Sequence, residues 1–170
     1  MGRYFFGLDL PINNKQKIAA WRDVHLPSDN KSVVLENFHI TLVFLGMVDD
    51  LTLQQCIAAA DNIVGSTFSL VLNDVGFWAK PKVLFLSSNK VDIALQTLVA
   101  DLENLALSNS IKLERRPYIP HLTLCRKATA HAVMSAQPEF EFTFTDFCLY
   151  ESKSTEQGVR YVVIHRWRLR

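Results

Sequence analysis

The chain has 170 residues, of which 49% are apolar, and this fits one compact domain with an ordinary core over residues 1–170. Its 18 Lys and Arg residues nearly balance its 17 Asp and Glu residues, so the formal net charge is only +1. This balance excludes a global attraction to nucleic acid or anionic membranes, so any polyanion site must come from local clustering. Because no run approaches ~18 consecutive apolar residues and the N-terminal apolar segment is too short for a secretory leader, we expect a cytoplasmic protein.

Strand and helix patterns alternate along the chain. A short aromatic run over residues 3–10 predicts a buried strand, and Pro11 then suits the start of an amphipathic helix. Gly46 and Gly65 are the expected ends of a strand and of a helix that begins near Asp50 or Thr52. The expected helices span 12–22, 50–64 and 91–107, a loop holds residues 27–30, and the expected strands span 3–10, 37–45, 68–73, 82–88, 111–114, 121–126, 140–149 and 159–167. This mixture predicts an α+β fold with mainly antiparallel sheets.

The two halves of the sequence resemble each other. A strand over 4–10, a helix and the segment Phe38-His39-Ile40-Thr41-Leu42 form one pass. A strand over 83–88, a helix and the segment Pro120-His121-Leu122-Thr123-Leu124 form the other. His39 and His121 are 82 residues apart, close to half of the chain. A repeat of this size predicts two similar lobes.

Each repeat places an imidazole and a hydroxyl on one face of a strand, because side chains at i and i+2 point the same way. His39 and Thr41 therefore share one face, and so do His121 and Thr123, whereas the apolar residues between them form the back. An imidazole with a pKa near ~6.5 exchanges protons at neutral pH, and a hydroxyl can bond a phosphate oxygen as its charge grows. A single strand of this kind would indicate only an ordinary semi-buried histidine. Two matching copies indicate a pair of histidines that cleaves a phosphodiester.

These segments resemble the 2H phosphoesterases and, within them, the bacterial RNA 2′,3′-cyclic phosphodiesterases formerly called 2′-5′ RNA ligases. The similarity covers the whole chain and is carried by His39-Ile-Thr-Leu, His121-Leu-Thr-Leu, Arg3-Tyr-Phe-Phe-Gly-Leu-Asp-Leu-Pro and Leu149-Tyr-Glu-Ser. It implies a bilobal pseudo-two-fold fold, with two mainly antiparallel sheets facing a central groove and helices outside. It also implies hydrolysis of cyclic phosphate ends to 2′-phosphomonoesters, possible reversible joining of 2′-5′ linkages, and no metal or cofactor. His39 would be the proton donor and His121 the acceptor.

A local basic cluster surrounds the second motif, formed by Arg115, Arg116, Arg126 and Lys127. Arg126 matches the family's phosphate-binding position, yet strict alternation points it away from His121. Either the strand twists or bulges after Cys125 or the side chain reaches around its end; the alternative is a solvated surface charge. Tyr118 is the preferred aromatic residue for stacking a base, ahead of Phe5, Phe6 and Trp78. Ser152 matches a segment of the family near the groove, but as a lone serine it is expected to be structural.

Other chemistries lack their motifs. The remaining histidines, His25, His131 and His165, have no metal-ligand spacing, and the three cysteines, Cys56, Cys125 and Cys148, are expected to be free thiols. Neither a nucleophile elbow nor a phosphate-binding glycine loop is present. We therefore predict a monomeric, metal-independent enzyme that acts on RNA ends or nucleotides with a 2′,3′-cyclic phosphate. The alternatives are a non-catalytic RNA-end or nucleotide-binding module and a phosphodiesterase for a small cyclic or 2′-5′ linked nucleotide.

Overall fold

A computed structural model describes residues 1–26, 31–114, 116–128 and 136–170. The expected loop at 27–30 lies outside these residues. The helices are α1 (Ile12–His25), α2 (Asp50–Ala60), α3 (Ile93–Ser108) and the short 3₁₀ turn η1 (Leu35–Asn37). The strands are β1 (Gly2–Asp9), β2 (Lys31–Ser32), β3 (His39–Val48), β4 (Phe68–Leu72), β5 (Asp74–Trp78), β6 (Val83–Ser87), β7 (His121–Arg126), β8 (Phe140–Phe144), β9 (Asp146–Thr155) and β10 (Gly158–Arg168).

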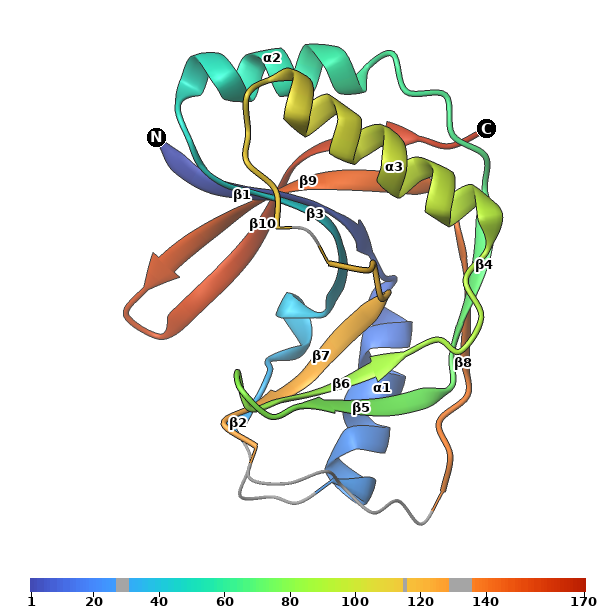
Figure 1. Ribbon diagram of the computed structural model, residues 1–170. Helices are drawn as coiled ribbons and strands as arrows, with labels where there is room; N and C mark the ends of the chain where they lie inside the picture. The colour runs from blue at the N-terminus through green and yellow to red at the C-terminus, as the bar shows by residue number, and fades with distance from the viewer. Residues whose placement is uncertain (27–30, 115, 129–135) are drawn as a thin grey trace.

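An eight-stranded antiparallel sheet spans both halves of the molecule. Its order is β10-β9-β1-β3-β7-β6-β5, with β2 beside β7, while β4 and β8 form a separate pair. Figure 1 shows the two halves diverging from the contact between β3 and β7, with α2 and α3 over the β1–β3–β9 half and α1 against the β5–β7 half. The predicted bilobal, antiparallel α+β fold is confirmed; the two expected sheets are joined along β3 and β7.

The sequence repeat corresponds to a pseudo-two-fold axis. The units β1–α1–β3 and β6–α3–β7 have the same order, and β3 pairs with β7 through Ile40 and Leu122, which are 82 residues apart. A two-fold axis relates the strands of an antiparallel pair, so the axis passes between these two residues. Both side chains are fully buried in a core that extends through both halves. The two histidines therefore flank the axis in equivalent positions.

The ends of β3 and α2 that were predicted from glycine residues were wrong. Gly46 does not end β3: its φ of 75° accommodates an irregularity opposite β1, and the strand continues to Val48. The helix α2 ends at Ala60, well before Gly65, because the Asn62 side chain donates to the Ala58 carbonyl oxygen and satisfies the last turn. Its N-cap is the residue before Asp50.

Two strand predictions also need correction, and the strands β2 and β5 were not predicted. Residues 111–114 are not a strand; the Ile111 amide instead donates to the Ala106 carbonyl oxygen at the end of α3. The segment 140–149 is divided at Thr145, because β8 pairs with β4 whereas β9 joins the large sheet. The strand β5 was not predicted, since Gly76 lowers its strand propensity. Gly76 is needed where the Phe85 ring of β6 passes close to its backbone. No helix in the described part of the chain is long and apolar enough to span a membrane.

Candidate active site

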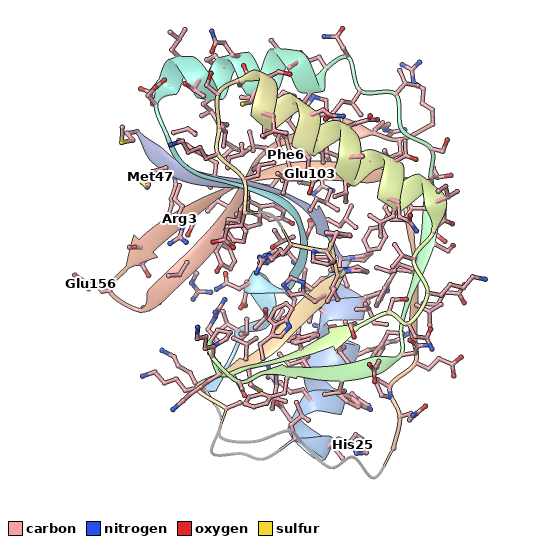
Figure 2. All side chains as sticks on the ribbon, in the orientation of Figure 1. Arg3, Phe6, His25, Met47, Glu103 and Glu156 are labelled. Carbon is pink, nitrogen blue, oxygen red and sulfur yellow. The ribbon has the colours of Figure 1, made fainter. Side chains whose placement is uncertain are left out.

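His39 and His121 begin two neighbouring antiparallel strands, β3 and β7. The Ile40–Leu122 pair brings His39 opposite Thr123 and Thr41 opposite His121. All four polar side chains are partly exposed, and the residues between them are buried. We call this side of the sheet the histidine face. Figure 2 shows side chains from both halves of the sheet directed into the space in front of it.

Each imidazole is held by the same kind of contact, a hydrogen bond to the backbone carbonyl two residues earlier. His39 Nδ1 lies 2.7 Å from the carbonyl oxygen of Asn37, and His121 Nδ1 lies 2.8 Å from that of Ile119. A carbonyl oxygen only accepts, so each Nδ1 carries the proton. In the neutral rings Nε2 is then unprotonated. His39 Nε2 lies 3.1 Å from Thr41 Oγ1, whose hydroxyl can donate to it.

Asn37 links the His39 segment to β10. Its side-chain amide donates to the Val159 carbonyl oxygen at 2.7 Å, and its side-chain oxygen accepts from the Tyr161 amide at 3.2 Å. The same residue's backbone oxygen accepts from His39 Nδ1–H. Asn37 therefore fixes both the tautomer of His39 and the position of the segment that carries it.

Aromatic rings surround both imidazoles. His39 packs against Phe5 at 4.8 Å between centroids and meets Tyr161 edge-on at 4.7 Å. His121 meets Trp78 edge-on at 4.6 Å. Each half of the sheet thus supplies an aromatic wall that limits contact between its histidine and water.

This environment lowers the pKa of both histidines. Burial is the main cause and lowers the pKa of His39 to about 4, although its bond to the Asn37 carbonyl opposes the shift. Burial also lowers the pKa of His121. The positive charge of Arg126 lowers the pKa of both rings, and Arg116 acts on His121 in the same direction. In the free protein at neutral pH, both rings are therefore neutral.

Arg126 shares the histidine face because β7 contains a bulge. Leu124 has no partner on β6, and Leu124 and Cys125 are both buried in succession. The extra residue resets the alternation, so the exposed Arg126 returns to the side of His121. Of the two alternatives left by the sequence, the bulge is the one found, and it precedes Cys125.

The pseudo-symmetric position on β3 holds an aromatic residue. Leu42 and Val43 are buried in succession at an equivalent bulge opposite β1, and Phe44 follows them 82 residues before Arg126. Its side chain is 43% exposed and packs against Phe5, which also contacts His39. One side of the histidine pair therefore presents the Arg126 guanidinium, and the other presents the Phe44 ring with the Arg3 guanidinium 6.0 Å from its centroid.

Tyr118 has a structural contact at the edge of this region. Its hydroxyl donates to the Thr41 carbonyl oxygen at 3.3 Å, and burial raises its pKa. Its ring also lines a hollow of about 350 Å³ beside α3, together with Arg116. Stacking of a base on Tyr118 stays a prediction.

The sequence-family model of the 2′-5′ RNA ligase superfamily matches residues 10–156 of this chain. The chain belongs to this superfamily. It is 33% identical over 170 residues to the RNA 2′,3′-cyclic phosphodiesterase of Escherichia coli K12, with 98% of this chain and 96% of that protein covered. A protein of the same name from Methanocaldococcus jannaschii is 28% identical over 180 residues, with 97% and 99% covered. A crystal structure of E. coli LigT complexed with 3′-AMP is 33% identical, covers 99% of this chain and 98% of that one, and has a TM-score of 0.93.

His165 does not join the histidine face of this member of the 2′-5′ RNA ligase superfamily. His165 contacts the Trp167 ring and lies 4.0 Å from Asp61, on a different part of the sheet. Arg115 and His131 lie outside the described residues. All three cysteines are buried and free. Within the described ranges, no three side chains of the His, Cys, Asp and Glu types gather to hold a metal ion; metal independence stays a prediction.

Two residues of the histidine face were missed from the sequence. Phe44 could have been found by applying the 82-residue repeat to Arg126 as well as to the histidines. Asn37 carried no signal, because its side chain acts through β10, more than 120 residues later in the chain.

Proposed function

We propose that this chain is an RNA 2′,3′-cyclic phosphodiesterase that yields 2′-phosphomonoester ends by acid–base catalysis. The observation that carries the proposal is the pair of equivalent imidazoles beside the pseudo-two-fold axis. In both rings a bond to a backbone carbonyl oxygen keeps the proton on Nδ1. The Nε2 atom of each ring is therefore available for proton transfer. Two such groups are what an in-line displacement at phosphorus requires.

In the reaction, His121 Nε2 accepts a proton from water as the water oxygen forms a bond to phosphorus. The bond between phosphorus and ribose O3′ breaks, and O3′ takes a proton from His39 Nε2. The phosphate remains on O2′. Solvent then removes the proton gained by His121 and restores the one lost by His39. This assignment of donor and acceptor follows the family resemblance, since the symmetric geometry permits either, and the roles exchange in the reverse reaction that joins 2′-5′ linkages.

Neighbouring side chains stabilise the transition state in this scheme. Thr41 and Thr123 donate to the non-bridging oxygens, and Arg126 neutralises the charge that grows on them. Phe44 provides a surface on which the terminal base stacks. The asymmetry between Phe44 and Arg126 orients the nucleotide, with its base toward β3 and its phosphate toward β7.

The low pKa of His39 requires an explanation if this residue is the acid. In the free protein its ring is neutral at pH 7, because its pKa is about 4. An anionic phosphate between the two rings favours the imidazolium and raises the pKa of each. Substrate binding therefore supplies the charge that allows His39 to hold a proton.

Two relatives that align over nearly their full lengths bear the name RNA 2′,3′-cyclic phosphodiesterase, which supports this substrate class. The solved relative with 3′-AMP supports recognition of a nucleotide by this fold. The expected monomeric state and cytoplasmic location stay predictions. A binding module without activity, or an enzyme for a small cyclic or 2′-5′ linked nucleotide, would retain the same aromatic and basic groups.

The decisive experiment incubates the purified protein with an oligoribonucleotide that ends in a 2′,3′-cyclic phosphate, and separates 2′- from 3′-phosphate products. We expect the 2′-phosphate, with excess chelator present. The His121→Ala variant should bind the oligonucleotide but hydrolyse it ~10²–10⁴-fold more slowly. Binding of the cyclic end without hydrolysis would support the binding module, and a 3′-phosphate product would refute the proposed cleavage of the bond to O3′.

A further inference from the structure

Five cations gather where β2, β6 and β7 end. Lys31 pairs with Arg126 across β2 and β7, and Val83 pairs with Arg126 across β6 and β7. Lys82 precedes Val83, Lys127 follows Arg126, and Lys80 lies in the turn between β5 and β6. We call the set Lys31, Lys80, Lys82, Arg126 and Lys127 the basic patch. Figure 2 shows nitrogen-tipped side chains extending from this end of the sheet, at the lower left of the view.

The basic patch has no ion-pair partner among the residues that the structure describes. All five side chains are exposed, in a chain whose net charge is only +1. Among the ion pairs of the described residues, none involves a member of the patch. The other half of the sheet differs, because Lys153 pairs with Glu151 at 3.2 Å and Arg160 with Glu36 at 3.6 Å. Among the described residues, the patch therefore places several positive charges without an ion-pair partner at one end of the histidine face.

Two members of the patch have an unfavourable backbone conformation. Lys82 and Lys127 have φ values of 54° and 55°, in the left-handed region that lysine rarely adopts. They are linked, since the Ala128 amide donates to the Lys82 carbonyl oxygen at 3.0 Å. A glycine at either position would avoid this strain, so each lysine holds its charge here at a local conformational cost.

The patch is continuous with the candidate active site through Arg126. Arg126 lies on the histidine face, because the bulge at Leu124 turns its exposed side chain to the side of His121 and Thr123. Lys127 and Lys82 extend the positive surface outward from it along the strand ends. If the terminal phosphate of a polyanion lies at Arg126, the basic patch is the nearest positive surface for its next phosphates.

We propose that the basic patch binds the phosphodiester backbone of the RNA strand that precedes the cyclic end. The inference rests on the proposed function and adds to it that the substrate is a polynucleotide, held over several phosphates, rather than a lone nucleotide. The contacts are to backbone phosphates, so they give affinity without base preference. Each phosphate neutralised on a single strand contributes about −0.7 to the slope of log affinity against log salt.

The test compares two substrates, adenosine 2′,3′-cyclic phosphate and an oligoadenylate with the same cyclic end. The double variant Lys82→Asn/Lys127→Asn removes two charges and is not expected to endanger folding, because asparagine tolerates a positive φ better than lysine. The matched control is Lys17→Asn/Lys112→Asn, which removes two exposed lysines elsewhere. Thermal unfolding followed by circular dichroism verifies the fold of each variant. The measured quantity is kcat/KM as a function of salt concentration.

We expect the unmodified protein to process the oligonucleotide with a steeper salt dependence than the mononucleotide. The patch variant should reduce the oligonucleotide slope by about 1.4, which corresponds to two phosphate contacts, and should leave mononucleotide hydrolysis and its salt dependence unchanged. The control variant should behave as the unmodified protein on both substrates. Equal slopes for the two substrates, or equal effects of the patch variant and the control, would overturn the patch while leaving the phosphodiesterase intact. Failure to hydrolyse either substrate would refute the proposed function and this inference with it.

Discussion

Acid should destabilise the folded protein through His39 before it titrates the carboxylates. The fold encloses this ring in its neutral form and holds its pKa at about 4, whereas an unfolded histidine titrates near 6.5. Because the folded pKa is the lower one, the unfolded chain binds the proton more readily. The stabilisation is complete above pH 6.5 and is lost as the pH falls toward 4. Linkage over the interval from pH 7 to pH 5 gives a loss of about 1–2 kcal/mol, the lower value reflecting residual contact of the ring with water.

The assay is urea unfolding at a series of pH values for the unmodified protein and His39→Gln. Glutamine retains an amide that can donate to the Asn37 carbonyl but does not titrate. The difference in unfolding free energy between the two proteins should therefore change by about 1–2 kcal/mol from pH 7 to pH 5. His165→Gln is the control, since it leaves the aromatic enclosure of His39 intact and should keep the loss. Parallel curves for the unmodified protein and His39→Gln would refute the claim that the fold selects the neutral ring.

The other predictions concern activity. His39→Ala or His121→Ala should lower kcat ~10²–10⁴-fold with a much smaller effect on KM, and a near-normal kcat in single-turnover assays would argue for a binding module. In the free protein the pKa values of His39 and His121 lie below 6.5, so the bell-shaped profile of kcat/KM against pH should have its maximum below pH 6.5. The maximum of the kcat profile should lie at higher pH, because bound phosphate stabilises the imidazolium. A flat profile would exclude the acid–base pair. Asn37→Ala should lower kcat about tenfold by releasing the His39 segment, with Asn37→Asp intermediate, and unchanged kcat in both would remove its positioning role. Phe44→Leu should raise KM about tenfold for a cyclic-ended substrate through lost stacking, and an unchanged KM would exclude the base from this ring.

The repeated H-x-T-L segments were sufficient to predict the pair of histidines and the side of each strand on which they lie. Side-chain alternation is a local property of an extended chain, and the pattern of apolar residues at Ile40 and Leu122 shows which side is buried. The 82-residue repeat also anticipated the pseudo-two-fold relation, because equivalent positions must fold alike to bring both imidazoles to one face. These conclusions needed no knowledge of distant contacts.

The orientation of Arg126 was decided only by tertiary structure. Its direction depends on a bulge at Leu124, and a bulge arises from pairing between strands rather than from the residues of one strand. The same reason explains why β3 continues through Gly46. Pairing partners far away in the sequence also determine the role of Asn37, whose side chain bonds to β10, and the low pKa of His39, which comes from aromatic rings on β1 and β10. The sequence by itself thus predicted which groups would carry the chemistry. The sheet determined how these groups are oriented and charged, because register, burial and bulges exist only between strands.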